Sequence, residues 1–374
     1  QNFIPISANR KPIGFLCFPY SFFSIIRYLF NYISNGFFSY KNPDIRSMHL
    51  LNKKGSIQVL DPIGRLRETS EIKILFLGDI MLSKSGNPYK VNESVQKLLK
   101  SADLIIANVE SPIVDKKNKI KRGLTLRFEM PISFLQSIYK CNESAKWVFN
   151  IANNHAFDTS NKNLKDLSGL IETAKIIKQN IPGSEVIGAN IGLAKSILSL
   201  KPENGPKIGV VGWTEIMNSD KKHFRKPIVR GVDLVSKIVE KIKLDHNFLI
   251  GFAHGNEEQS YHPLKTTRNR WINLTGPEKF DLIVGHGPHV VQPCEKVKNR
   301  LLFHSIGNFC SPSGPSQTKV GLIPAITLKY DKENVIEAEY NMHFLELESE
   351  RISAFTLKNY HGKYSKIVNR LRKT

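Results

Sequence analysis

The sequence predicts an α/β fold, because apolar runs that end in turn residues alternate with segments of helical periodicity. Apolar runs bounded by Gly, Pro or Asn are typical of buried strands, and strands that alternate with helices form α/β domains. The chain has 374 residues, 41% of them hydrophobic, which is enough for an ordinary globular core. Its four cysteines form no CxxC pair, so no disulfide scaffold is implied. We expect one large domain with flanking segments, or two modest domains.

Ten apolar runs are expected to form strands, and they span residues 72–77, 104–107, 148–152, 185–187, 207–211, 248–253, 282–284, 301–304, 322–329 and 335–344. The last two runs follow each other directly and alternate clearly, so they predict an antiparallel pair that closes the sheet. Helical spacing of apolar residues appears in residues 91–100, 164–179 and 232–244, with Ser160 or Asn161 as a cap for the second helix.

The composition divides the chain into segments, and the α/β domain is expected to span residues 72–350. Residues 41–71 are polar and rich in turn residues, which is typical of a linker. Residues 1–40 are rich in aromatic residues, but Pro19 and Arg27 interrupt them, which favours an amphipathic segment on a membrane surface over a spanning helix. A helix that packs on the main domain is the alternative.

The formal net charge of +21 is concentrated at the two ends of the chain. Residues 1–70 hold nine Lys/Arg and three Asp/Glu, and a basic tail at residues 351–374 holds seven Lys/Arg and no acid. Such ends favour polyanions or anionic lipid head groups. Solvated tails in a Lys-rich sequence are the alternative. Nucleic acid is not expected as a partner, because basic and aromatic residues do not interleave as they do in known nucleic-acid-binding modules.

Polar residues follow five of the predicted strands, at the point where each apolar run ends. In chain order they are Asp79, Asn108 with Glu110, Asn153 to His155, His254, and His286 with His289. Ligands of open α/β sheets bind at the carboxyl ends of the strands, so we expect these side chains to share one rim. Carboxylates, amide oxygens and imidazoles together are the ligand inventory of a metal site.

The loop from Gly285 to His289 is the most specific of these motifs. It places two imidazoles three residues apart in a turn shaped by Gly and Pro, directly after a buried strand, and packed core histidines seldom come in such pairs. The other motifs keep structural alternatives, which are a common turn at Gly78–Asp79, a cap before Pro112, a helix cap by Asn154 or Asp158, and a solvated turn after His254. The histidines without such a context, expected to be surface or packing residues, are His223, His246, His262, His343 and His361.

In order and spacing, the motifs GDIM, NVESP, NNHAFD, HGNEE with a later Pro263, GHGPHVVQP and SIGNF resemble those of the bacterial capsule-synthesis CapA/PgsA family. That family belongs to the calcineurin-like metallophosphoesterase superfamily. The resemblance covers roughly residues 72–310 and implies a metallophosphoesterase-like α/β sandwich, in which central sheets of mixed strands are flanked by helices. Family members commonly have His-Trp-Gly-x-Glu, whereas His254 is followed here by Gly255 and Asn256, which keeps an acid at Glu258 but reshapes the loop.

The resemblance also implies a set of metal ligands, namely Asp79, Glu110, Asn154, His254, His286 and His289. Glu110 would bridge two ions, and mixed oxygen and imidazole ligation suits Mn, Zn or Fe. Met81 stands where many phosphoesterases of the superfamily have a His, so one ion has fewer protein ligands and one or two ions are expected. His155, oriented by Asp158, would protonate the leaving group, and Glu258 would act as a base.

The function implied by the resemblance is metal-dependent hydrolysis in capsule or poly-γ-glutamate biosynthesis, with metal-activated water as the nucleophile. The substrate would be a phosphoester or an anionic capsule-type polymer. The alternative is a non-catalytic scaffold that binds such a polymer during assembly or export. Both hypotheses place the protein in the cell envelope or at a membrane, and a cytoplasmic location stays open.

Overall fold

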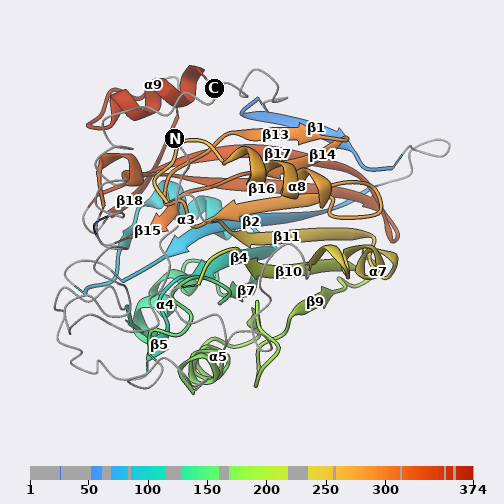
Figure 1. Cartoon of the computed structure of the whole chain (residues 1–374), viewed down its shortest axis with the longest axis horizontal. Coiled ribbons are helices and arrows are strands. Elements are labelled where there is room, and N and C mark those ends of the chain that lie inside the picture. Colours follow the sequence, from blue (N-terminus) through green and yellow to red (C-terminus); the bar gives the residue numbers. More distant parts are fainter. Residues whose placement is uncertain are drawn as a thin grey trace.

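The computed structural model of the chain describes residues 52–60, 69–82, 86–114, 128–159, 168–217, 235–255, 258–311, 314–348, 351–356 and 359–373, together with Ile26. Within these residues, two β-sheets pack face to face and helices cover their outer faces (Figure 1). The α/β sandwich predicted from the sequence is thereby confirmed. The predictions for the other residues of the N-terminal segment, for most of the linker and for the cap at Ser160 or Asn161 lie outside the described residues.

The larger sheet contains ten strands. They are β1 (Lys54–Gln58), β2 (Ser70–Ile80), β3 (Lys90–Val91), β4 (Leu104–Val109), β7 (Lys146–Asn150), β8 (Glu185–Ile187), β15 (Asn308–Cys310), β16 (Val320–Asp331), β17 (Asn334–Leu347) and β18 (Arg351–Phe355). Their order is β3-β18-β17-β16-β2-β4-β7-β8, with β1 paired to β17 and β15 to β2. β2, β4, β7 and β8 are parallel, whereas β16 and β17 form the expected antiparallel pair.

The smaller sheet contains six strands in the order β13-β14-β12-β11-β10-β9. They are β9 (Ile197–Leu200), β10 (Ile208–Thr214), β11 (Phe248–His254), β12 (Leu282–His286), β13 (Cys294–Val297) and β14 (Arg300–Phe303). β10, β11, β12 and β14 are parallel, so their carboxyl ends lie at one edge. A separate pair is formed by β5 (Ile113–Val114) and β6 (Met130–Pro131).

Helices flank the two sheets. They are α3 (Glu93–Lys100), α4 (Ile132–Tyr139), α5 (Ser168–Asn180), α7 (Val239–Leu244), α8 (Lys265–Asn273), the 3₁₀ turn η3 (Ser316–Lys319) and α9 (Ser365–Lys373). α3, α4 and α5 pack on the larger sheet, and α7 and α8 pack on the smaller sheet. Figure 1 shows α9 on the opposite side of the molecule from α4 and α5.

Three apolar layers hold this arrangement together, as the alternation along the strands requires. On β2, Ile74 and Phe76 point into the layer between the two sheets, whereas Leu75 and Leu77 point toward the helices on the outer face. Trp213 on β10 lies in the third layer, beneath α7 and α8. Each such side chain stabilises the fold by about 1.5–3 kcal/mol when it is fully buried. The strands are therefore fixed on both faces, which gives their carboxyl ends a rigid base.

The structure places folded elements in two segments that we expected to be a linker and a tail. β1 lies within residues 41–71 and pairs antiparallel with β17. In the basic tail at residues 351–374, β18 pairs with β17 and α9 inserts Val368 into the layer between the sheets. Both additions complete the sandwich, so the ordered domain extends beyond residues 72–350 at each end.

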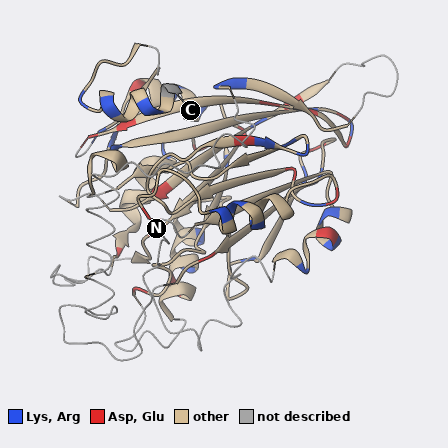
Figure 2. Cartoon of the chain, turned by 45° about the horizontal axis from the view of Figure 1, so that its top comes forward, with Lys and Arg blue, Asp and Glu red and all other residues tan. Residues whose placement is uncertain are grey.

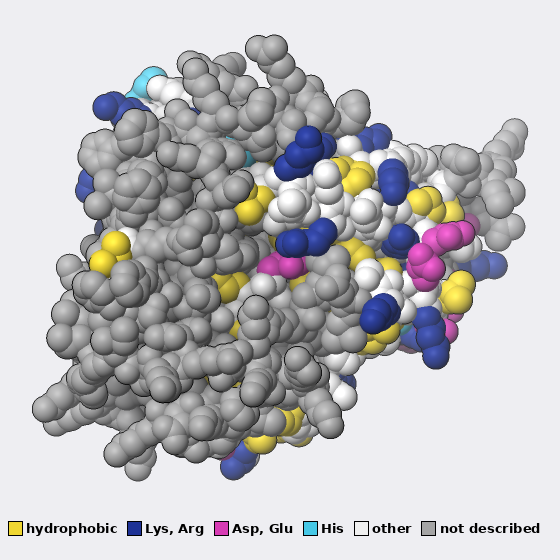
Figure 3. Space-filling model, viewed as in Figure 1, with side chains coloured by type: hydrophobic (Ala, Val, Ile, Leu, Met, Phe, Trp, Pro, Cys, Tyr) yellow, Lys and Arg dark blue, Asp and Glu magenta, His cyan; other side chains and the backbone are white. Residues whose placement is uncertain are grey.

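The basic residues of the described part are distributed over several elements, with acidic residues among them (Figure 2). On the described part of the face in Figure 3, Lys and Arg side chains lie singly among hydrophobic and acidic ones. The high net charge therefore does not by itself mark one binding face in this part of the chain. Among the described residues, no helix has the length and apolar character needed to span a membrane.

Candidate metal centre

The carboxyl ends of five parallel strands meet at one edge of the sandwich. β2, β4 and β7 come from the larger sheet, and β11 and β12 from the smaller one. Asp79 at the end of β2 pairs in register with Asn108 on β4, and His254 on β11 pairs with His286 on β12. The two sheets meet here, because Nδ1 of His286 lies 3.2 Å from Oδ1 of Asp79. The structure thus brings together side chains that are more than 200 residues apart in sequence.

Two groups of possible metal ligands share this rim. In the first, ligand atoms of Asp79, His254 and His286 lie within 4.8 Å of one another, and the Nδ1 atoms of the two histidines are 3.1 Å apart. In the second, the same holds for Asp79, Glu110 and His289. His289 lies 3.1 Å from Asp79 through Nδ1 and 3.6 Å from Glu110 through Nε2. Asp79 is common to both groups, whereas the sequence led us to expect Glu110 as the bridge.

Asp79 is held in place by backbone and amide donors. The side-chain amide of Asn108 donates to its Oδ1 at 2.7 Å, and the backbone N–H of Gly287 donates to its Oδ2 at 3.0 Å. The preceding residue must be glycine, because a Cβ at Gly78 would lie 1.9 Å from the carbonyl oxygen of Gly307. This close approach joins β2 to β15 and fixes the direction of the carboxylate.

The loop after β12 has a backbone conformation that is unusual for its sequence. Gly287 has φ +102° and His289 has φ 61°, and a non-glycine residue adopts such a left-handed conformation only when its surroundings enforce it. The Nδ1 atom of His289 lies 2.9 Å from the side-chain oxygen of Asn308 on β15, which helps to hold the ring over the rim. Strain of this kind concentrates at functional sites.

Burial and neighbouring charges shift the pKa values of the acids and histidines of this rim. Burial raises the pKa of Asp79, but hydrogen bonds from His286 and His289 outweigh it, so the pKa lies well below its usual range. The pKa of Glu110 is raised well above its usual range by burial and by the negative charge of Asp79. Burial lowers the pKa of His254. Burial also lowers the pKa of His289, but the adjacent carboxylates outweigh it, so its pKa is well above the usual value.

Several buried polar atoms of this rim have no hydrogen-bond partner among the residues that the structure describes. They are both carboxylate oxygens of Glu110, the side-chain oxygen of Asn154 and Nε2 of His286. Buried polar atoms are almost always paired, and an unpaired buried carboxylate costs several kcal/mol. No Lys or Arg among the described residues pairs with Asp79 or Glu110. The donor set of carboxylate, amide oxygen and imidazole atoms therefore fits a divalent cation.

The predicted catalytic residues lie beside these groups. Nδ1 of His155 lies 2.6 Å from Oδ2 of Asp158, and the ring of Phe128 packs edge-on against the imidazole at 4.6 Å between centroids. The same Asp158 oxygen accepts the backbone N–H of Phe128 at 2.8 Å. Burial raises the pKa of Glu258, whose carboxyl group is close enough for the charges of His289 and His155 to act on it.

The sequence placed Asn108 and Asn153 at the rim but did not identify Asn150, which orients the rim from behind. Asn150 and Asn153 donate to the side-chain oxygen of Asn108 at 3.2 and 3.3 Å, so the amino group of Asn108 is turned toward Asp79. The polar Asn150 inside the apolar run at residues 148–152 was the available signal. Asn308 belongs to the SIGNF motif, and it lies on a strand of three residues that pairs with β2.

Two further buried acids, Asp281 and Glu295, lie outside this rim, and we call them the closed acids. Asp281 binds Lys243 at 2.6 Å, Arg300 at 2.8 Å and the backbone N–H of Leu249 at 2.8 Å. Both oxygens of Glu295 are likewise paired, to Nε and Nη2 of Arg268 at 2.9 and 2.7 Å and to Nε2 of His304 at 2.6 Å. The protein neutralises both acids with its own cations.

The helix α9 reaches the loop that carries His286 and His289. Nη2 of Arg370 donates to the backbone oxygen of Val291 at 3.1 Å, and its guanidinium lies 3.8 Å from the centre of the Tyr261 ring. Burial lowers the pKa of Arg370 to about 10. This side chain joins the C-terminal helix to two loops of the rim.

An α/β sandwich of two sheets, with carboxylates, imidazoles and an amide at the strand ends, defines a metallophosphoesterase-like protein. The family model described as "Bacterial capsule synthesis protein PGA_cap" matches residues 73–313. The chain belongs to this family, and the resemblance seen in its motifs is confirmed.

Curated relatives agree with this assignment. The "PGA biosynthesis protein CapA" of Bacillus subtilis (strain 168) is 26% identical over 268 residues, which cover 68% of this chain and 67% of that protein. The "Capsule biosynthesis protein CapA" of Bacillus anthracis is 26% identical over 270 residues, covering 68% of this chain and 63% of that protein, so this chain spans less than two thirds of it.

Among solved structures, the calcineurin-like phosphoesterase YfkN from Bacillus subtilis has a TM-score of 0.44 at 13% identity, covering 82% of this chain and 97% of that one. A phosphatase from Mycoplasma pneumoniae has a TM-score of 0.43 at 12% identity, covering 74% and 94%. Both likenesses are weak, and the family assignment rests on the sequence comparisons.

Proposed function

We propose that this protein is a metal-dependent hydrolase of the bacterial cell envelope that acts in capsule biosynthesis. The observation that carries the proposal is Glu110, a fully buried carboxylate with no hydrogen-bond partner, which lies among imidazoles beside a second buried carboxylate. The family of the chain supports the role in capsule biosynthesis.

The metal ligands would be the two groups that meet at Asp79. His254 and His286 complete the first group, and Glu110 and His289 complete the second, with the side-chain oxygen of Asn154 as a further ligand. Ions of the Mn, Zn or Fe type suit these donors, and when bound they supply Lewis acidity that activates water and polarises the bond to be cleaved. Gly287 and Asn108 keep the shared carboxylate oriented for this task.

His155 would hand a proton to the leaving group. Asp158 and Phe128 fix its ring, because the carboxylate contacts Nδ1 and the aromatic ring packs against the imidazole. The opposite ring nitrogen, Nε2, would then be the proton donor. A positioned acid of this kind contributes about 10²–10⁴-fold to the rate. Glu258 would serve as a second titratable group at the rim, because burial raises its pKa toward the working range of a base.

The substrate class would be a phosphoester or an anionic capsule-type polymer such as poly-γ-glutamate. The names of the two CapA relatives support the polymer. We further propose that residues 72–350 carry the function of the domain, with β1, β18 and α9 as structural additions, and that the aromatic N-terminal segment contacts a membrane surface.

The test is turnover of p-nitrophenyl phosphate, bis-p-nitrophenyl phosphate and poly-γ-glutamate with added Mn²⁺. We expect Asp79→Asn to abolish turnover, and His155→Asn to reduce it by about 10²–10⁴-fold without loss of metal. Glu333→Gln is the matched acid-to-amide control, because Glu333 is exposed and pairs only with exposed Lys201. Turnover that persists in Asp79→Asn contradicts the proposal.

The second candidate function is a non-catalytic scaffold that binds the capsule polymer. Met81 favours it, because this buried thioether occupies the position where many phosphoesterases have a metal-binding His. Salt-sensitive binding of poly-γ-glutamate without any turnover, unchanged in His155→Asn, would establish the scaffold instead.

A further inference from the structure

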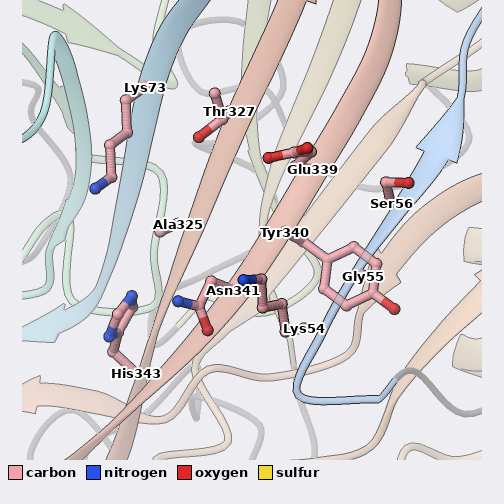
Figure 4. Close-up of a pocket in the computed structure, with 10 residues that line it drawn as sticks. All are labelled: Lys54, Gly55, Ser56, Lys73, Ala325, Thr327, Glu339, Tyr340, Asn341 and His343. Atoms are coloured by element: carbon pink, nitrogen blue, oxygen red, sulfur yellow. The ribbon is translucent and has the colours of Figure 1, made fainter.

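A second polar site lies on the outer face of the larger sheet, away from the metal centre. It is a pocket of about 440 Å³, lined by residues of β1, β17, β16 and β2 (Figure 4). Its β2 residue, Lys73, precedes Asp79 by six positions, which corresponds to about 20 Å along a strand. The pocket is therefore separate from the rim that holds the candidate metal ligands.

The register of the four strands explains how the pocket is built. Ser56, Glu339, Thr327 and Lys73 are successive partners across the sheet and form one row. Lys54, Asn341 and Ala325 form the next row, two residues along each strand. Because side chains alternate along a strand, both rows face the same side, while Tyr340 points into the layer between the sheets.

The two lysines of the pocket lack acidic partners. Glu339 is already paired, because its carboxylate accepts a hydrogen bond from Lys329 at 2.5 Å. Lys73 donates from Nζ to the hydroxyl of Ser101 at 2.8 Å, and no acidic side chain among the described residues forms an ion pair with it or with Lys54. Burial and the positive charge of Lys73 lower the pKa of His343, which lines the same pocket. The pocket thus presents two lysines and one acid, Glu339, which is already paired with a third lysine.

The spacing of the lysines suits a polymer. β1 and β2 are separated by three strand-to-strand steps and the two lysines lie one row apart, so the backbones of Lys54 and Lys73 are about 16 Å apart. A chain with repeated carboxylates can contact both ammonium groups through separate carboxylates. Hydroxyl and amide donors lie between them, at Thr327 and Asn341 (Figure 4).

We propose that this pocket binds the carboxylates of an extended acidic polymer, with Lys54 and Lys73 as the two charged contacts. This inference rests on the proposed function, because poly-γ-glutamate has such repeated carboxylates. The pocket would hold that chain about 20 Å from the metal centre. A chain held at two separated points gains affinity because the second contact is intramolecular. The binding itself requires no catalysis.

The test measures binding of a fluorescein-labelled oligo-γ-glutamate of about ten residues to the full-length chain, by fluorescence polarisation at low salt. We expect the Kd to rise about tenfold or more in Lys54→Gln/Lys73→Gln, since charged hydrogen bonds are lost. The control with equal charge is Lys97→Gln/Lys241→Gln, whose lysines are exposed on α3 and α7, and its Kd should change less than about twofold. Equal weakening in both double variants overturns the proposal.

Two further measurements make the result independent of folding and of the metal centre. In the wild-type protein, the oligomer should shift the NMR signal of the His343 ring, which is assigned by its loss in His343→Gln. An unshifted signal at saturation overturns the site. Asp79→Asn should bind the oligomer as tightly as the wild-type protein, so a failed hydrolase assay and a failed pocket are distinguishable. Binding of polyphosphate in place of oligo-γ-glutamate overturns the carboxylate assignment.

Discussion

The metal centre and the closed acids are equally buried, yet among the described residues only the closed acids are paired with Lys or Arg. Asp281 and Glu295 contact Lys243, Arg300 and Arg268 through both of their oxygens. Glu110 has no hydrogen-bond partner, and Asp79 is surrounded by imidazoles, an amide and a backbone N–H. Burial alone therefore does not distinguish a structural acid from a functional one.

The difference lies in which positive charge the fold supplies. Arg and Lys bring a permanent charge that closes the site, whereas an imidazole can give up its proton and then leaves a carboxylate able to bind a cation. The ion pairs of the closed acids thus stabilise the fold. The acids of the rim remain able to bind a ligand, which lowers the stability of the metal-free protein. Four predictions test this difference between the acids of the rim and the closed acids.

The largest effect is expected on metal content. Asp79→Ala and His286→Ala should each lower bound Mn or Zn from full occupancy to less than about a tenth, because each removes a ligand and loss of mere supporting partners already costs about 10–100-fold in affinity. The measurement is elemental analysis of purified protein, with circular dichroism to establish that the fold persists. Full occupancy in either variant would contradict the metal centre.

The closed acids should show the reverse behaviour. We expect Asp281→Asn to lower the free energy of unfolding by about 3–5 kcal/mol, because Lys243 and Arg300 are left buried beside a neutral amide. Metal content per folded molecule should not change. Urea unfolding measures the first quantity and elemental analysis the second, with Glu333→Gln as the exposed control. A loss below about 1 kcal/mol would show that the pairs are not structural.

Histidines of the metal centre also differ in pKa from a buried histidine outside it. Burial and the charge of Arg370 lower the pKa of His262 to about 4, whereas carboxylates raise that of His289. His262 takes up protons more readily in the unfolded chain, so its contribution to stability is complete above about pH 6.5 and is lost as the pH falls toward 4. At pH 5 the loss is about 2 kcal/mol.

This pH effect is isolated by comparing His262→Gln with the wild-type protein. Urea unfolding of metal-free protein at pH 7.5, 6 and 5 should give a shallower decline for the variant. Parallel curves for the two proteins would show that His262 does not contribute to the pH dependence of the free energy of unfolding. Our expectation that this histidine is an ordinary packing residue agrees with its burial but did not anticipate its cationic neighbour.

The smallest effect is expected for Glu110→Gln in metal-free protein. Here the amide should raise the free energy of unfolding by about 1 kcal/mol, because it removes a buried charge that repels Asp79. The same substitution should weaken metal binding. Chelator-treated protein unfolded in urea at pH 8 gives the measurement. Destabilisation as large as in Asp281→Asn would place Glu110 among the structural acids.

The sequence predicted the strands with a continuous apolar run or a clear alternation and missed short strands that contain charged residues. The run at 185–187 coincides with β8, and the runs at 248–253 and 282–284 lie within β11 and β12. β13 was missed, because its sequence CEKV contains a buried acid, Glu295, whose partners Arg268 and His304 come from elsewhere in the chain. α8 buries only Thr267 and Trp271, so it has no apolar stripe to detect.

The side chains of the rim could be named because they follow strand ends, but their partners could not. Asp79 and His286 are visible as polar residues after apolar runs. The donor at the backbone of Gly287 and the relay from Asn150 through Asn108 depend on how two sheets meet. Local pattern therefore identifies candidate ligands, whereas the sharing of Asp79 between two groups follows only from the assembled fold.

The contact between Arg370 and Val291 determines when the rim can be completed during synthesis of the chain. Translation proceeds from the N-terminus at about 5–20 residues per second, so Val291 is made several seconds before the arginine that binds its carbonyl oxygen. Until α9 docks, the loop with the two histidines lacks one of its supports. The nascent chain can therefore fold its sheets first, and the histidine loop becomes fully fixed only when the last helix arrives.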